Sequence, residues 1–195
     1  MEGFYLHYQG SPKGAAPLSA KDYGRNVRMY FEYRAPTASR AGWVRYYLFY
    51  PGDKIPTGVT PLFGHQGDWE AYAVRLGPTG DATAVGYQAH GAWSKQSLQS
   101  ATRVSDGLGT HAWVYVANGS HATYSTPGWH GLDRTSNGVH WPTWREATFV
   151  DVKAAPWYGF GGAWGNVGID THTTGPLGPG RNLMQSVPPE WLVRG

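Results

Sequence analysis

Two carboxylates and one imidazole lie close together in the segment Gly64-His65-Gln66-Gly67-Asp68-Trp69-Glu70. If a strand begins at Asp68, alternate side chains share a face, so Asp68 and Glu70 lie on one face about 7 Å apart. Like charges at that spacing repel, and burial increases the cost unless a cation or hydrogen-bond donors compensate. His65 can bring its imidazole to the same point, and such oxygen and nitrogen donors suit Mg²⁺, Ca²⁺, Mn²⁺ or Zn²⁺. The same residues also fit a turn-capping Asp, a Glu paired with an Arg, and a surface His.

Two more histidines follow expected strands. His121 lies in the polar turn at residues 118–124, and His90 ends the run at residues 88–93. Each is a candidate metal ligand, ligand-binding residue or general base, or simply a turn residue. Ser120 precedes His121, but neighbours on an extended chain point to opposite faces, and the chain has no G-x-S-x-G motif, so a serine hydrolase is not expected.

The composition favours strands and turns. The 195 residues include 28 Gly and 14 Pro, too many for helical bundles or coiled coils. They also include 10 Trp, which supply enough apolar surface to exclude intrinsic disorder. With no Cys, disulfides and thiolate metal sites are excluded, so any metal must be held by oxygen and imidazole.

Charge and hydropathy exclude other classes. The net charge of +3 comes from scattered basic residues, so nucleic-acid binding is not expected. The N-terminal residues lack the pattern of a signal peptide, and no stretch resembles a membrane span, so we expect a soluble chain of open localisation. Composition leaves the oligomeric state open as well.

Period-two alternation and turn residues predict an all-β chain: a single-domain β-sandwich with long Gly/Pro/Trp-rich loops. We expect the domain to cover residues 27–195, after an irregular N-terminal arm at residues 1–26. Pro51-Gly52-Asp53-Lys54 is typical of a turn, and residues 94–110 are expected to be a Ser/Gln-rich connection. The expected strands are residues 27–33, 43–50, 68–76, 82–88, 112–116 and 148–152.

The tryptophans divide into two groups. Those within expected strands are predicted to form the core, namely Trp43, Trp69 and Trp113. The others lie in Gly- and Pro-rich loops, where an indole can pack against the domain, stack on a sugar or enter a membrane interface; these are Trp129, Trp141, Trp144 and Trp164.

Several segments together resemble a known family. Residues 44–51, 64–70, 118–124, 160–165 and 175–179 are similar, in order and spacing, to the vacuolar protein sorting-associated protein 62 family, over roughly residues 27–191. The function of that family is poorly characterised.

A more distant similarity is to the necrosis-inducing Nep-like cytolysins, whose heptapeptide G-H-R-H-D-W-E differs here at Gln66 and Gly67. The resemblance implies a β-sandwich that holds a divalent cation and binds the sugar head group of a sphingolipid. It assigns the metal site to Asp53, His65, Asp68 and Glu70, and it matches His121 and His90 to later functional positions. Gly67 replaces a His of the motif, so lysis of plant cells does not follow.

Three functions fit these residues. The first is a binding module in which a divalent cation, Mg²⁺ or Ca²⁺ before Mn²⁺ or Zn²⁺, helps recognise a glycan or a lipid head group, including at a membrane. Its ligand-binding residues would be His90, His121, Trp129, Trp141 and Trp144. The second is a metal-dependent hydrolase of a phosphoester, ester or glycan, with a metal-activated water and His121 or His90 as general acid or base. The third is a structural or assembly domain stabilised by a cation.

Overall fold

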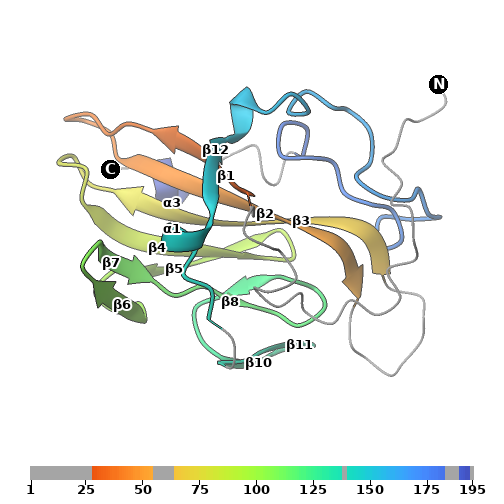
Figure 1. Cartoon of the computed structure of the whole chain (residues 1–195), viewed down its shortest axis with the longest axis horizontal. Helices are drawn as coiled ribbons and strands as arrows, with labels where there is room; N and C mark the ends of the chain where they lie inside the picture. Colours follow the sequence, from red (N-terminus) through yellow and green to blue (C-terminus); the bar gives the residue numbers. More distant parts are fainter. Residues whose placement is uncertain (1–27, 55–63, 138–139, 183–188, 194–195) are drawn as a thin grey trace.

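The computed structural model describes residues 28–54, 64–137, 140–182 and 189–193, and strands dominate it (Figure 1). The largest sheet in this part of the chain has six strands in the order β12-β1-β2-β3-β4-β5. Neighbouring strands are antiparallel, except that β1 and β12 are parallel. The strands are β1 (Arg28–Arg34), β2 (Gly42–Lys54), β3 (Gly64–Leu76), β4 (Ala82–Ala89), β5 (Ala92–Ser97) and β12 (Thr148–Asp151).

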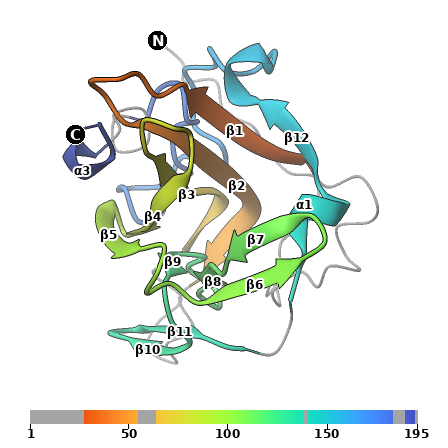
Figure 2. The ribbon, with the colours of Figure 1, turned by 90° about the vertical axis from the view of Figure 1, so that its left-hand side faces the viewer.

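Three two-stranded sheets accompany the large one, and Figure 2 shows them along one side of it. They pair β6 (Arg103–Asp106) with β7 (Gly109–Ala112), β8 (Tyr115–Val116) with β9 (Thr123–Tyr124), and β10 (Gly128–His130) with β11 (Asp133–Thr135). Helical turns are short: α1 (Thr143–Glu146), the 3-10 turn η2 (Val152–Ala154) and α3 (Glu190–Val193). None of the helices within the described residues is long and apolar enough to cross a membrane.

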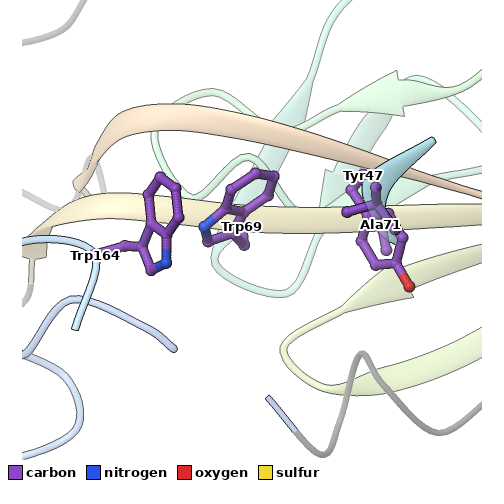
Figure 3. Packing of buried hydrophobic residues seen from close by; sticks show 5 residues of the cluster. Tyr47, Trp69, Ala71 and Trp164 are labelled. Carbon is purple, nitrogen blue, oxygen red and sulfur yellow. The ribbon is translucent and has the colours of Figure 1, made fainter. Parts of the chain in front are cut away.

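One face of the large sheet carries the main aromatic core. Trp69 and Ala71 of β3 pack there with Tyr47 of β2, and Trp164 from the C-terminal segment packs beside Trp69 (Figure 3). The rings of Trp69 and Trp164 meet edge to face, with centroids 5.1 Å apart. Aromatic pairs favour this geometry, so specific ring contacts as well as the burial of apolar surface hold the C-terminal segment against the sheet.

The opposite face carries Asp68 and Glu70, and β9 packs across it. Thr123 of β9 accepts a hydrogen bond from the backbone N–H of Gln88 at 2.7 Å and donates to the carbonyl of Ala71 at 3.0 Å. These bonds tie β9 to β4 and β3, and they fix the turn that precedes β9. That turn carries His121, so the hydroxyl of Thr123 sets where this imidazole lies.

The all-β class predicted from the sequence is confirmed, and so is the alternation that separates Asp68 and Glu70 from Trp69, Ala71 and Ala73. The expected turn at residues 51–54 is wrong, because β2 continues through it and pairs with β3 as far as Lys54 opposite Gly64. The ladder bonds of a long antiparallel pair outweigh the turn preference of Pro and Gly. The expected N-terminal arm, residues 1–26, lies outside the described residues.

Residues 94–116 differ from the prediction. The expected connection at 94–110 contains the end of β5, all of β6 and the start of β7. The expected strand at 112–116 is wrong in part, because β7 ends at Ala112 and β8 begins at Tyr115. These strands are short, and each is paired with a single partner strand. The alternation of apolar and polar side chains along them is therefore too brief to predict a strand from the sequence.

Candidate functional site

Asp53 and His65 face each other where β2 ends and β3 begins, as a directly opposed cross-strand pair. His65 Nδ1 lies 2.7 Å from the carbonyl oxygen of Gly67, so this nitrogen carries the proton and donates. The other ring nitrogen, Nε2, lies 3.5 Å from Oδ2 of Asp53. In the neutral imidazole, Nε2 and the carboxylate are both acceptors, so a proton or a cation between them would be stabilised.

Asp68 and Glu70 follow on β3, and both are buried, with 7% and 9% of their surface exposed. Nδ1 of His121 lies 3.1 Å from Oδ2 of Asp68. The imidazole of His121 in turn stacks on the ring of Tyr50, with centroids 4.0 Å apart and planes 5° from parallel. The stack and the hydrogen bond together fix the orientation of His121 over the carboxylate of Asp68.

The carboxylates of this acidic site, defined as Asp53, Asp68 and Glu70, interact electrostatically. Burial, and then the charge of Asp68, raise the pKa of Asp53 to about 6. Burial, followed by the charges of Asp68 and Asp53, raises the pKa of Glu70 well above its usual value. Nearby imidazoles act in the opposite direction on Asp53. Negative charge is therefore concentrated here beyond what the surrounding donors neutralise.

Asp133 of β11 forms the centre of a second polar group beside the acidic site. Its buried carboxylate accepts hydrogen bonds from Ser120 at 2.6 Å, from Tyr124 at 2.6 Å and from Nε2 of His90 at 2.7 Å. Burial acts to raise the pKa of Asp133, but the bonds from His90, Ser120 and Tyr124 outweigh it and lower the pKa to about 2. The hydrogen bond to Asp133 raises the pKa of His90, against the effect of burial.

His90 and His121 share an uncommon backbone conformation. Their φ angles are 49° and 58°, and they are the non-glycine residues with positive φ among the residues described here. This conformation is unfavourable for residues with a Cβ, so it persists only where other contacts stabilise it. Both histidines point toward neighbouring carboxylates, which connects the strained backbone to the polar site.

The sequence-predicted metal ligands supply suitable atoms, because carboxylate oxygens and an imidazole nitrogen suit a hard or borderline divalent cation. The Nδ1 bond of His65 to a backbone carbonyl is the kind of contact that orients metal-binding histidines. Even so, no group of three or more His, Asp or Glu side chains in the described ranges is positioned to hold a metal ion. A cation would therefore require side-chain rotation to gather its ligands.

The loop tryptophans lie in different surroundings. Trp129 in β10 is 70% exposed, and the guanidinium of Arg134 lies 5.4 Å from its ring centroid. Trp141 is half-buried. Trp144 is also half-buried, where it stacks on His111 with centroids 3.9 Å apart and donates to Asp106. The site role predicted for these three residues stays untested, but only Trp129 of the three is exposed in the described structure.

Trp164 and Trp113 resolve two of the alternatives left by the sequence. Trp164 lies in a loop, as expected, and of its two possible roles it has the packing one, since the residue is 8% exposed and belongs to the aromatic core. Trp113 was expected in the core but is half-buried, with its ring edge to face against His140. Neither distinction is visible in sequence, because Gly- and Pro-rich segments can lie on a sheet as closely as strands do.

Sequence reasoning did not find Asp133 or Tyr124. Asp133 stands in Gly131-Leu132-Asp133-Arg134, which has no chemical motif, and it reaches His90 only because β11 folds back toward the end of β4. Ser120 and His121 were expected not to form a catalytic pair, and in the structure they bond to different carboxylates, Asp133 and Asp68.

Comparisons with known proteins find solved structures of low similarity. No protein-family model matches the chain, and no curated protein matches it, so the resemblance to the vacuolar protein sorting-associated protein 62 family is unsupported. A solved structure described as "Toxin fold for microbial attack and plant defense" is 20% identical, with a TM-score of 0.41, over 64% of this chain and 51% of that one. A second, "NLPPya in complex with mannosamine", is 17% identical, with a TM-score of 0.40, over 64% and 50%. The chain spans about half the length of these structures, and similarity at this level identifies no function.

Proposed function

We propose that this protein is a binding module whose acidic site recognises the hydroxyl groups of a glycan or of a lipid head group with the help of a divalent cation. The observation that carries the proposal is the pairing of Asp53 with His65 beside two buried carboxylates, Asp68 and Glu70. Carboxylates and imidazoles bind sugar hydroxyls directly, and a cation held among them adds further coordination to the same hydroxyls.

The geometry at His65 supports a cation. Its Nε2 and the Oδ2 of Asp53 are acceptors in the neutral site, and they lie 3.5 Å apart. Two acceptors at that distance repel unless a positive charge lies between or beside them. Because no three such side chains in the described ranges are positioned to hold a metal ion, the side chain of Asp68 or Glu70 would have to rotate to become the third ligand. The cation would supply positive charge and coordination sites for hydroxyl oxygens.

The β10–β11 hairpin supports a ligand at the same end of the molecule. Asp133, at its second strand, bonds to His90 and Ser120, while Trp129 on its first strand is exposed. The register pairs Trp129 with Arg134, whose guanidinium lies over the indole. An exposed indole beside polar groups suits the apolar face of a sugar ring or a membrane interface.

Calorimetric titration with Mg²⁺, Ca²⁺, Mn²⁺ and Zn²⁺ tests the cation, and a glycan and lipid array read with and without chelator tests the ligand. We expect one of these cations to bind, and we expect chelator to abolish binding of the protein to the array. Asp68→Asn should lose both cation binding and array binding. Asp81→Asn removes an exposed carboxylate elsewhere and serves as the matched control. Array binding that persists in chelator contradicts the role of the cation. A cation that raises the melting temperature with no array binding supports the structural alternative instead.

A second candidate function rests on the contact between His90 and Asp133. The imidazole of His90 is 60% exposed, while its carboxylate partner is 2% exposed. An accessible imidazole oriented by a buried carboxylate is the arrangement of a general base. A hydrolase would cleave nitrophenyl phosphates, esters or glycosides, and His90→Gln would remove the cleavage. The absence of turnover with all three classes of substrate contradicts this candidate.

A further inference from the structure

A cavity of about 550 Å³ lies beside the large sheet, at a place that shares no residue with the acidic site. It is formed by β3, β4, β5 and α3. The residues that matter for its chemistry are Arg75, Thr83, Lys95, Gln96, Ser97 and Trp191. Its volume falls within the range of about 300–1,000 Å³ that is usual for small-molecule sites.

The sheet register brings these residues together. Arg75 pairs with Ala84, which pairs with Ser97, so the three form one row across β3, β4 and β5. Gly86 and Lys95 form the next row on the same face. The cationic side chains of Arg75 and Lys95 therefore border the same cavity, although their strands, β3 and β5, are separated by β4.

Gly86 explains how Trp191 reaches the sheet. A Cβ at Gly86 would lie 2.1 Å from Cζ2 of Trp191, so any larger residue would displace the indole. The ring of Trp93 lies beside the same glycine, with its centroid 6.2 Å from that of Trp191. Packing therefore holds the indole of Trp191 in place beside the cavity. A rigid aromatic ring of this kind is a surface on which a sugar ring can stack.

The polar atoms of the cavity are suited to an anionic, hydroxyl-bearing ligand. Its charged lining residues are Arg75 and Lys95, both positive. Ser97 lies in the same row as Arg75 and Ala84 and adds a hydroxyl to this lining. A hydroxyl can donate to, or accept from, a hydroxyl group of a ligand.

We propose that this cavity is a second binding site, which takes an acidic saccharide: the sugar ring packs against Trp191, and the carboxylate or sulfate of the sugar pairs with Lys95 and Arg75. Ser97 offers its hydroxyl to a hydroxyl group of the sugar. This site needs no cation, and so it differs from the acidic site, which repels anions.

The full chain is titrated with glucuronate, and binding is monitored by NMR from the indole N–H signal of Trp191, which is assigned by its loss in Trp191→Phe. Glucose is the control without a charge, and inorganic sulfate is the control without a sugar ring. We expect glucuronate to shift the Trp191 signal in the presence of chelator and in Asp68→Asn. Lys95→Gln should weaken binding by about two- to fivefold, as loss of one exposed ion pair does. Arg28→Gln, which removes an exposed charge on β1, should leave binding unchanged.

Three kinds of result would overturn the proposal. One is a Trp191 signal that does not respond to glucuronate. Another is equal binding of glucose and glucuronate, or equal binding in Lys95→Gln and the parent chain, since either removes the role of the acid group. The third is inorganic sulfate binding as tightly as glucuronate, which would make the cavity an anion site with no preference for a sugar. None of these results depends on the acidic site, so failure here leaves the proposed cation site to its own test.

Discussion

Nε2 of His90 lies 2.7 Å from Oδ2 of Asp133, although the two residues are 43 positions apart in the sequence. The contact joins the end of β4 to β11, and Asp133 extends it to Ser120 and Tyr124. One buried carboxylate thus connects three segments that surround the candidate site.

Asp133→Asn should destabilise the protein. The amide keeps the shape of the side chain but loses the charge, and one of its terminal atoms cannot accept hydrogen bonds, so buried donors lose partners. We expect a loss of about 2–4 kcal/mol in the free energy of unfolding, measured with denaturant. Asp81→Asn, at an exposed carboxylate, should change it by less than about 0.5 kcal/mol. Equal effects of the two changes would contradict the central role of Asp133.

The stabilisation by His90 should depend on pH. The pKa of His90 is raised in the folded state, first by its hydrogen bond to Asp133. Its contribution is therefore fully present below the unfolded pKa of about 6.5, and it is lost as the pH rises through the higher folded value. Because the imidazole is largely exposed, we expect no more than about 1 kcal/mol. The difference in unfolding free energy between the parent chain and His90→Gln should be larger at about pH 5.5 than at about pH 8.5. A difference that is constant or reversed would contradict the charge-assisted pair.

Cation binding should weaken in acid. The pKa of Asp53 is raised to about 6 by burial and by Asp68, so a proton competes with a cation for this carboxylate below that pH. Competition by one proton predicts about a tenfold loss of Mn²⁺ affinity between about pH 7 and pH 5. Calorimetry in two buffers of different ionisation enthalpy should also detect proton release. Affinity that does not change over this range would exclude Asp53 as a ligand.

Gly67→Ala should be strongly destabilising. Gly67 has a φ of 70°, and a Cβ there would lie 1.6 Å from the carbonyl oxygen of Trp164. We expect a loss of about 3 kcal/mol or more, from backbone strain together with displacement of the C-terminal segment. Gly80→Ala is the matched control, since Gly80 has a φ of 90° with nothing near its Cβ, and it should cost about 1–2 kcal/mol. Similar losses for the two variants would show that the contact with Trp164 contributes little.

Trp129→Ala should separate binding from stability. The indole is exposed, so its removal should change the unfolding free energy by less than about 0.5 kcal/mol while it lowers binding on the glycan and lipid array. Trp144→Ala should do the reverse, with a loss of about 1–2 kcal/mol from the His111 stack and the bond to Asp106. Unchanged array binding in Trp129→Ala would remove this residue from the site.

Much of the large sheet could be predicted from the sequence. The alternation at residues 68–74 assigned Asp68 and Glu70 to one face and Trp69 and Ala71 to the other, as the structure has them. Period two is a local property of an extended chain, so it needs no knowledge of partners. The motif containing His65 and the absence of Cys likewise identified oxygen and imidazole as the available ligand types.

Other features were decided by tertiary structure alone. The extension of β2 through Asp53 depends on β3 as its partner, because Pro51 and Gly52 locally favour a turn. The bond from His90 to Asp133, the burial of Trp164 and the cavity beside Trp191 each join segments far apart in the chain. Sequence spacing carries no information about such contacts, since they follow from how strands pair and how loops pack on the sheet. The chain thus specifies by itself which chemical groups are available and on which strand face they lie, and the folded structure determines which of them meet.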